Sequence, residues 1–484
     1  MKKKSLAFNS VLSGFQKLFS IVFPLITFPY ISRILYVEDI GKINFVSSFL
    51  SYFVLVAGLG INNYATREAA KIRDDKKKLN QFASEIFSIN IITTIISYLL
   101  LCANLLIFRN LDKYNFLILV HSFLIIGSTL SVSWVYSMEE DYLYITIRSI
   151  VVQIISLILL FIFVHKPSDY FIYAIINVFS QVGASVFNFF NSKKYVSFKF
   201  TFNLNFKKHL SPILVIFASA VAVTIYVNSD MTLLGIICDD EAVGLYSRSV
   251  RIYSIIKQMV ASMVIVGLPH LSNILKQDNF DEYINVANDV FKNILMISLP
   301  VGIGISCTAG YIINIIAGSK YSGAIISLMI LGVSSIFAIL SSFNTYCVLL
   351  PLKKEKIHMV ATYLSAILNV VLNIFILKTY GINGAAFTTL LSELLVFVIG
   401  LLYIKKKTIF YRIYSFTNKE LVTLLIGVFS IIFISTVVPF FITNYVICFV
   451  IIVIISVISY FSILYLLKYS SLLKFLKKKK LSKF

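Results

Sequence analysis

The chain has 484 residues, of which 58% are hydrophobic and only 13% are charged, and its formal net charge is +21. Soluble domains are about one quarter charged and do not contain repeated apolar runs of roughly 18 or more residues, so this composition excludes a set of soluble domains and indicates one polytopic membrane protein. The five cysteines are scattered without a CxxC spacing and the five histidines form no HExxH-like pair, so the sequence predicts no metal centre and no cofactor.

Apolar runs separated by short polar breaks predict about fourteen membrane-spanning helices, because each crossing requires about 20 residues. Their predicted centres lie, in chain order, near Pro24, Phe53, Ile95, Phe123, Ser156, Val178, Ala222, Met259, Pro300, Ser335, Ile367, Leu391, Ser430 and Ile455. The expected fold is therefore an all-α polytopic membrane protein. Two six-helix halves would occupy residues 1–211 and 212–419, and two further helices with a basic tail would occupy residues 420–484.

Most lysines and arginines outside these spans lie on the side of the two termini, in residues 2–4, 62–81, 191–211, 405–419 and 468–484. Because positively charged loops stay on the cytoplasmic side, we expect both termini to be cytoplasmic. The same distribution explains the net charge as a determinant of orientation, so no nucleic-acid partner is expected. The sequence contains no Walker A motif, so transport is not expected to depend on ATP hydrolysis by this chain.

A four-residue pattern occurs once in each predicted half. Glu38-Asp-Ile-Gly41 opens the second span, and Glu241-Ala-Val-Gly244 opens the eighth. Six spans separate the two copies, so both copies face the same side of the membrane. This placement predicts parallel halves related by an axis normal to the membrane.

Five short stretches, spread from the first span to the twelfth, carry a resemblance to a known family. They are Phe28-Pro-Tyr-Ile-Ser-Arg-Ile-Leu35, Tyr64-Ala-Thr-Arg-Glu-Ala-Ala-Lys71, Trp134-Val-Tyr-Ser-Met-Glu-Glu140, Asp230-Met-Thr-Leu-Leu-Gly235, and Tyr380-Gly-x-x-Gly-Ala-Ala386 preceded by Asn369 and Asn373. In this order and spacing they resemble the oligosaccharide flippases of bacterial polysaccharide biosynthesis, within the multidrug/oligosaccharidyl-lipid/polysaccharide exporter superfamily. The third stretch departs from the family pattern, because Ser137 and Met138 stand where Gln-Gly is usual.

The resemblance implies a two-bundle transporter that works by alternating access in the bacterial cytoplasmic membrane. Its substrate would be an undecaprenyl-pyrophosphate-linked oligosaccharide, carried to the outer leaflet for O-antigen, capsule or a related surface polysaccharide. Membrane lipids, a polysaccharide polymerase and a chain-length regulator are the expected partners.

Charged side chains inside the predicted spans are the candidate functional residues. One stripe of the eighth span carries Arg248, Arg251, Ser254, Gln258 and Ser262. Arginine facing lipid would be costly, so this stripe is expected to face the interior of the bundle, where planar guanidinium groups suit a diphosphate. The alternative is that the two arginines snorkel to the outer interface. Lys257 lies on the other side of this helix.

Three further charges complete the candidate set. Asp230, near the end of the seventh span, would pair with the arginines or hold a coupling cation; alternatively it is a structural or interfacial acid. Glu393 lies deeper, where a carboxyl group is protonated unless it is paired, which suits proton or sodium coupling. Arg33, at the outer end of the first span, would contact substrate or snorkel to the interface.

Two other functions compete with this hypothesis. A cation-coupled multidrug antiporter of the same superfamily would have an acidic or apolar cavity, whereas the charges within these spans are mainly cationic. An integral-membrane glycosyltransferase or ligase would need catalytic carboxylates and usually a large outer loop, and the predicted outer connections are short. We therefore expect no catalytic residue and no enzymatic activity.

Overall fold

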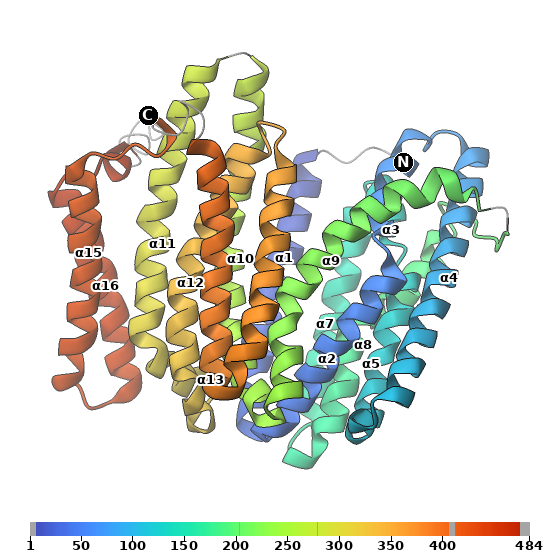
Figure 1. Ribbon diagram of the computed structural model, residues 1–484, viewed down its shortest axis with the longest axis horizontal. Helices are drawn as coiled ribbons and strands as arrows, with labels where there is room; N and C mark the ends of the chain where they lie inside the picture. The colour runs from blue at the N-terminus through green and yellow to red at the C-terminus, as the bar shows by residue number, and fades with distance from the viewer. Residues whose placement is uncertain (1–5, 203, 278, 406–411, 475–484) are drawn as a thin grey trace. The chain divides into compact units, whose positions relative to one another are not determined.

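The computed structural model describes residues 6–202, 204–277, 279–405 and 412–474 (Figure 1). Within these ranges every regular element is a helix and no strand occurs, which confirms the predicted all-α class. The chain divides into two compact units, Met1–Gly244 and Leu245–Phe484, which are described separately. The three-part division at residues 211 and 419 stays a prediction, and residues 475–484 of the basic tail lie outside the described residues.

Unit 1 contains the first nine α-helices, two short 3₁₀ segments and the first turn of α10. Their bounds are α1 (Leu6–Ile34), α2 (Val37–Gly58), α3 (Ile61–Lys71), α4 (Lys76–Ile107), η1 (Arg109–Tyr114), α5 (Asn115–Leu130), α6 (Ser133–Met138), α7 (Tyr142–Phe163), η2 (Pro167–Asp169), α8 (Tyr170–Ser192) and α9 (Phe206–Ile237).

Unit 2 contains the remainder of α10 and the helices that follow it. Their bounds are α10 (Asp240–Lys276), α11 (Phe280–Ile316), η3 (Ser319–Ala324), α12 (Ile325–Phe343), the π-helical η4 (Asn344–Leu349), α13 (Glu355–Lys405), α15 (Asn418–Val437), η5 (Val438–Phe440) and α16 (Tyr445–Leu466). Figure 1 shows α15 and α16 as a hairpin next to α11, in agreement with their packing.

Each of the predicted span centres lies within one of these helices. The described residues contain 12 helices long and apolar enough to cross a membrane, and a shorter apolar segment, Val22–Ile34, lies in α1. One of the 12, Glu355–Ile404, holds two predicted centres, Ile367 and Leu391. Between them Gly381 has φ 49° and ψ −132°, which breaks the helical geometry of α13 into two arms. Glycine adopts this positive φ without the steric cost that a Cβ would add.

Small residues and short polar contacts join the helices of unit 1. The core helix α2 packs against α4, α5 and α9. The Ser48 hydroxyl of α2 donates to the Asn228 carbonyl of α9 at 2.7 Å and lies 2.9 Å from the Thr232 hydroxyl. A Cβ at Gly235 would lie 2.2 Å from the ring of Phe45, so glycine is required for this close approach. Such contacts stabilise helix pairs in lipid, where apolar burial alone gives little driving force.

Unit 2 is organised around α12, which packs between α11 and α13. Gly302 and Gly332 face one another across the α11–α12 contact, and a Cβ on either would lie within 2.9 Å of the other's carbonyl oxygen. The Ser306 hydroxyl donates to the Met329 carbonyl at 2.8 Å in the same contact. The close glycine approach and this hydrogen bond hold the two helices together.

The two copies of the four-residue pattern pack directly on one another, both within unit 1. A Cβ at Gly41 would lie 1.7 Å from the carbonyl oxygen of Asp240, and a Cβ at Gly244 would lie 2.1 Å from that of Val37. Val37 and Asp240 each precede the glycine of their own copy by four residues, so the contact is reciprocal. Each glycine therefore allows the start of the other helix to approach at backbone distance.

Candidate functional site

Helix α10 carries the predicted polar stripe, and the structure gives the two arginines different environments. Arg248 is buried, with 6% of its surface exposed, and its guanidinium lies 5.3 Å from the centre of the buried Tyr321 ring in η3. Arg251, one turn further along, is exposed. An aromatic face stabilises a cation by attraction to its quadrupole, so Tyr321 helps to hold the charge of Arg248 inside the unit.

The residues that follow Arg251 along the stripe are accessible as well. Ser254, Gln258 and Ser262 are all exposed on α10. A cation, an amide and two hydroxyls therefore form a continuous accessible face on a helix long and apolar enough to span a membrane. This face can supply hydrogen-bond donors to an anionic or sugar-like group.

Glu393 on the second arm of α13 is buried, with 3% of its surface exposed, and it has two hydrogen-bond donors on α10. The Tyr253 hydroxyl donates to its Oε1 atom at 2.7 Å, and the Lys257 ammonium donates to the same oxygen at 2.5 Å. Tyr253 and Lys257 are four residues apart and so lie on one face of α10. A deep carboxylate is thus held by an ammonium and a phenol.

Sequence reasoning missed Lys257 and Tyr253. The helical periodicity correctly separated Lys257 from the arginine stripe, but it could not show what the opposite face of α10 contacts. The available signal was the coincidence of one lysine and one glutamate, each deep within an apolar span, since such charges are rarely left without a partner.

Asp230 and Arg33 belong to unit 1 and so are described apart from these residues. Asp230 is buried on α9, with 7% of its surface exposed. Two residues further along α9, the Thr232 hydroxyl lies 3.5 Å from the Tyr52 hydroxyl. Arg33 is exposed in the last turn of α1. Within unit 2 the structure brings Arg248, Arg251 and Gln258 onto one helix.

A buried polar network joins the two arms of α13. The Thr388 hydroxyl donates to the Asn373 side-chain oxygen at 2.7 Å, and the Asn373 amide donates to the Asn369 side-chain oxygen at 3.1 Å. All three side chains are at most 1% exposed. The network joins the two arms across the Gly381 kink. The second arm is the one that carries Glu393.

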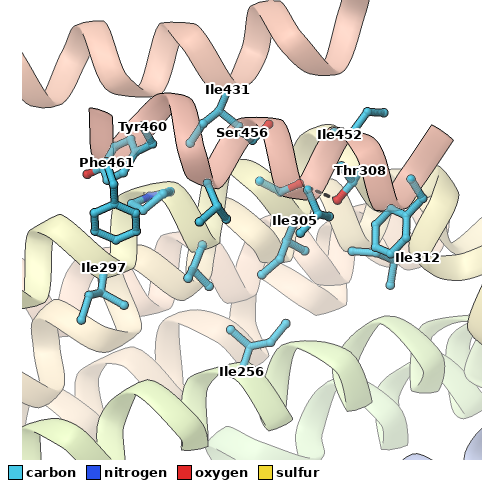
Figure 2. Close-up of a pocket in the computed structure, with 16 residues that line it drawn as sticks. Ile256, Ile297, Ile305, Thr308, Ile312, Ile431, Ile452, Ser456, Tyr460 and Phe461 are labelled. Carbon is cyan, nitrogen blue, oxygen red and sulfur yellow. Dashed lines mark hydrogen bonds between the residues drawn. The ribbon is translucent and has the colours of Figure 1, made fainter. Parts of the chain in front are cut away.

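Unit 2 also contains an apolar cavity of about 380 Å³ between α11, α15, α16 and one residue of α10, Ile256 (Figure 2). Its lining is aliphatic and aromatic except for Thr308, Ser456 and Tyr460. The Thr308 hydroxyl donates to the Gly304 carbonyl, and the Tyr460 hydroxyl donates to the Met296 carbonyl at 3.0 Å. Two of the three polar groups are therefore satisfied within the protein, and the cavity suits a hydrocarbon chain.

Metal binding is not supported by this arrangement. Among the described residues no group of three or more histidine, cysteine or acidic side chains could hold a metal ion. The described cationic, amide and hydroxyl groups instead suit a ligand that carries negative charge and hydrogen-bond acceptors.

Two comparisons with solved structures concern the fold. The "Lipid II flippase MurJ, inward closed conformation" superimposes with a TM-score of 0.73 at 18% sequence identity, covering 94% of this chain and 98% of that chain. An inward-facing multidrug resistance MATE family transporter of the MOP superfamily gives a TM-score of 0.55 at 14% identity, covering 81% of this chain and 94% of that chain. At these identities the likeness establishes a shared fold alone.

Sequence comparisons identify the family. A protein of Escherichia coli strain K12 described as "Putative O-antigen transporter" is 27% identical over 398 residues, which cover 79% of this chain and 92% of that protein. A protein of Shigella dysenteriae with the same description is 23% identical over 395 residues, covering 79% and 96%. Both relatives are described as putative O-antigen transporters, in agreement with the expectation that this chain is not an enzyme. The family model described as "Polysaccharide biosynthesis protein" matches residues 7–275, more than half of the chain, so the chain belongs to this family.

Proposed function

We propose that this protein is a flippase that moves an undecaprenyl-pyrophosphate-linked oligosaccharide across the cytoplasmic membrane by alternating access. The product would serve O-antigen, capsule or related surface polysaccharide synthesis, alongside a polymerase and a chain-length regulator. Support comes from the family, from the described O-antigen transporters and from the MurJ-like fold.

The accessible arginine stripe of α10 is the observation that carries this proposal. An arginine that faces lipid within a span is costly, so an exposed Arg251 followed by Ser254 and Gln258 favours a water-filled surface. A guanidinium stays charged when it is desolvated and binds phosphate oxygens bidentately. Arg251 would therefore contact the diphosphate, with Gln258 hydrogen-bonding the first sugars.

Arg248 would act with Arg251 but from a buried position. Its guanidinium is held over Tyr321, so its charge adds to the positive potential of the stripe while its position is restricted. Arg33, exposed at the end of α1, is the candidate cation that unit 1 contributes.

Energy coupling is assigned by this proposal to Glu393, with Asp230 as the second candidate. In the structure Lys257 and Tyr253 hold Glu393 in the way that a bound cation would. Exchange of the ammonium for a proton or sodium ion would free Lys257 and alter the contact between α10 and α13. Such exchange would connect ion entry to the reopening of the cavity.

The apolar cavity beside α15 and α16 would hold part of the polyprenyl chain. Its volume of about 380 Å³ lies within the roughly 300–1,000 Å³ range of pockets that bind small molecules. A polyprenyl chain offers only apolar surface, which matches a cavity lining that contains no charged residue. The two helices that follow the predicted second half would in this way serve the lipid part of the substrate.

The orientation belongs to the same proposal. Both termini would be cytoplasmic, and two parallel halves would be related by an axis normal to the membrane. The reciprocal packing of Gly41 and Gly244 supports such a relation, since equivalent positions of the two copies contact one another.

Surface glycan display in a producing strain tests the proposal. Arg251→Ala should abolish the glycan while the protein stays in the membrane, and Arg251→Lys should rescue only part of it because lysine lacks the bidentate fork. Arg67→Ala is the matched control, because Arg67 is exposed and already pairs with Glu68 at 3.0 Å. Normal glycan display by Arg251→Ala would reject this site.

A further inference from the structure

Arg148, on the second turn of α7 in unit 1, is a half-buried cation without a hydrogen-bond acceptor for two of its donors. Its Nε and Nη1 atoms are buried and have no hydrogen-bond partner, and no ion pair joins it to a carboxylate in the described part of the chain. The guanidinium lies 5.7 Å from the centre of the Tyr144 ring. The ring offsets part of the desolvation cost but supplies no acceptor, so these donors suit an anionic ligand.

Two lysines lie at the same end of the neighbouring helix. The Tyr144 hydroxyl donates to the Phe187 carbonyl at 3.2 Å, which joins the start of α7 to the end of the antiparallel helix α8. Lys193 and Lys194 follow α8 directly, and both are exposed. Neither forms an ion pair with a carboxylate among the residues that the structure describes.

Each of these lysines also lies over an aromatic ring. The Lys193 ammonium is 5.4 Å from the centre of the Phe190 ring, and the Lys194 ammonium is 4.7 Å from that of Tyr195. The ring of Tyr136, on α6, stacks on Tyr144 with centroids 5.1 Å apart and meets Tyr195 edge-on at 5.9 Å. A continuous group of tyrosines therefore connects Arg148 to Lys194.

Among the described residues, no ion pair joins the acidic turn before α7 to these cations. Asp141 accepts a hydrogen bond from the Tyr195 hydroxyl at 2.8 Å, and Glu140 lies 3.8 Å from the guanidinium of Arg73. Burial, together with the hydrogen bond to Asp141, raises the pKa of Tyr195 above its ordinary value, so its phenol stays a donor to Asp141.

We propose that Arg148, with its two unsatisfied buried donors, binds the phosphate of a lipid headgroup, and that Lys193 and Lys194 add positive potential at the same end of these helices. Tyrosines are favoured where apolar helices meet the headgroup layer, and arginine and lysine there attract anionic lipids. The site lies on α7 and α8 of unit 1, and the polar stripe of α10 is not part of it. It does not depend on the proposed transport, so it can hold even if the flippase assignment fails. The phosphate can come from a membrane phospholipid or from the diphosphate of a polyprenyl lipid.

Native mass spectrometry of the purified full-length protein tests this site. Wild type should retain phosphatidylglycerol at least fivefold more than phosphatidylcholine when both are supplied in mixed micelles. Arg148→Gln should lose that preference, and Arg148→Lys should keep part of it. Arg67→Gln, a guanidinium in the same unit that already pairs with Glu68, should behave as wild type. Equal retention of phosphatidylglycerol by wild type and Arg148→Gln, in properly folded protein, overturns the proposal.

A surface variant covers the case in which Arg148→Gln does not fold. Lys193→Gln combined with Lys194→Gln changes only exposed side chains, and it should reduce phosphatidylglycerol retention at least twofold; no reduction counts against the site. Undecaprenyl pyrophosphate then identifies the source of the phosphate. If it displaces phosphatidylglycerol from wild type and from Arg67→Gln, the bound phosphate is that of a polyprenyl diphosphate; if phosphatidylglycerol is retained, it is that of a membrane phospholipid. Both results support a phosphate site.

Discussion

Lys257 of α10 donates a hydrogen bond to Glu393 of α13, with 2.5 Å between Nζ and Oε1. Glu393 is 4% exposed at its side chain and Lys257 is 31% exposed, so the carboxylate is the deeply buried member of the pair. Removing one member leaves the other without its oppositely charged neighbour at membrane depth, whereas changing both together does not. Comparing the single variants with the double variant therefore separates a structural role of the pair from a role in energy coupling.

Glu393→Gln should lower transport and weaken its dependence on the proton or sodium gradient. We expect it also to reduce the free energy of unfolding by about 1–3 kcal/mol, since Lys257 loses its charged acceptor. Lys257→Gln combined with Glu393→Gln should recover most of that stability but not the gradient dependence. Thermal unfolding in detergent and gradient-driven transport in vesicles measure the two effects.

The control for this prediction is Glu68→Gln on α3, which removes a partly exposed carboxylate that pairs with Lys71. It should leave both transport and gradient dependence unchanged. If Glu393→Gln transports at the wild-type rate with the same gradient dependence, Glu393 is structural and Asp230 becomes the remaining coupling candidate.

Arg248 and Arg251 should respond differently to the same substitution. Arg248→Ala removes a buried side chain from the Tyr321 ring, so we expect a loss of about 1–3 kcal/mol in unfolding free energy together with lower transport. Arg251→Ala removes an exposed side chain and should change stability by less than about 0.5 kcal/mol while abolishing transport. Comparable unfolding midpoints for the two variants would show that the burial of Arg248 does not contribute to the stability of the protein.

The Gly41–Gly244 contact predicts a sharp effect of small substitutions. Gly41→Ala or Gly244→Ala adds a Cβ where a carbonyl oxygen already lies at about 2 Å, so the helix starts must separate. Overpacking of this kind costs about 1–3 kcal/mol, and we expect lower thermal stability and reduced transport from either change.

Gly304→Ala is the matched control for the stability of the glycine variants, because a Cβ there meets no heavy atom within 4 Å; its transport is not compared, since Gly304 lines the apolar cavity. Alanine favours a helix interior by up to about 1 kcal/mol over glycine, so this variant should be neutral or slightly stabilised. An unchanged unfolding temperature for both Gly41→Ala and Gly244→Ala would mean that the two helix starts are not in tight contact.

Much of the fold could be predicted from local patterns. The apolar runs located a helix at every predicted centre, because span length and hydropathy are properties of contiguous sequence. The repeated Glu-x-x-Gly pattern led to the prediction of parallel halves, whereas the contact between its two copies came from the structure. The periodicity of α10 grouped Arg248, Arg251, Ser254, Gln258 and Ser262 on one stripe, and all of these except Arg248 are exposed.

The remaining features depend on contacts between distant residues, which periodicity does not encode. Lys257 and Glu393 lie on separate helices, so the wheel of α10 alone could not pair them. The same limit explains why Arg248 and Arg251 were given one environment, since only the packing of Tyr321 in η3 separates them. The apolar cavity depends on how α11, α15 and α16 pack, which no single helix specifies.

Cysteine labelling tests the predicted orientation. In a background without the five native cysteines, cysteines at positions 76 and 354 should be protected from a membrane-impermeant reagent in intact cells. Cysteines at positions 166 and 320 should react, because the positive-inside rule puts these exposed loop positions outside. Labelling at 76 but not at 320 would invert the topology.

Translocation of a fluorescent undecaprenyl-pyrophosphate-linked oligosaccharide in reconstituted vesicles tests the proposed flippase function most directly. The fraction of sugar that becomes accessible to an externally added glycosidase is followed over time, with wild type, Arg251→Ala and protein-free vesicles in parallel. We expect wild type to expose the sugar well above the protein-free rate and Arg251→Ala to fall to that rate. Wild-type vesicles that leave the sugar inaccessible but export a cationic dye against a proton or sodium gradient would contradict the flippase and indicate a multidrug antiporter.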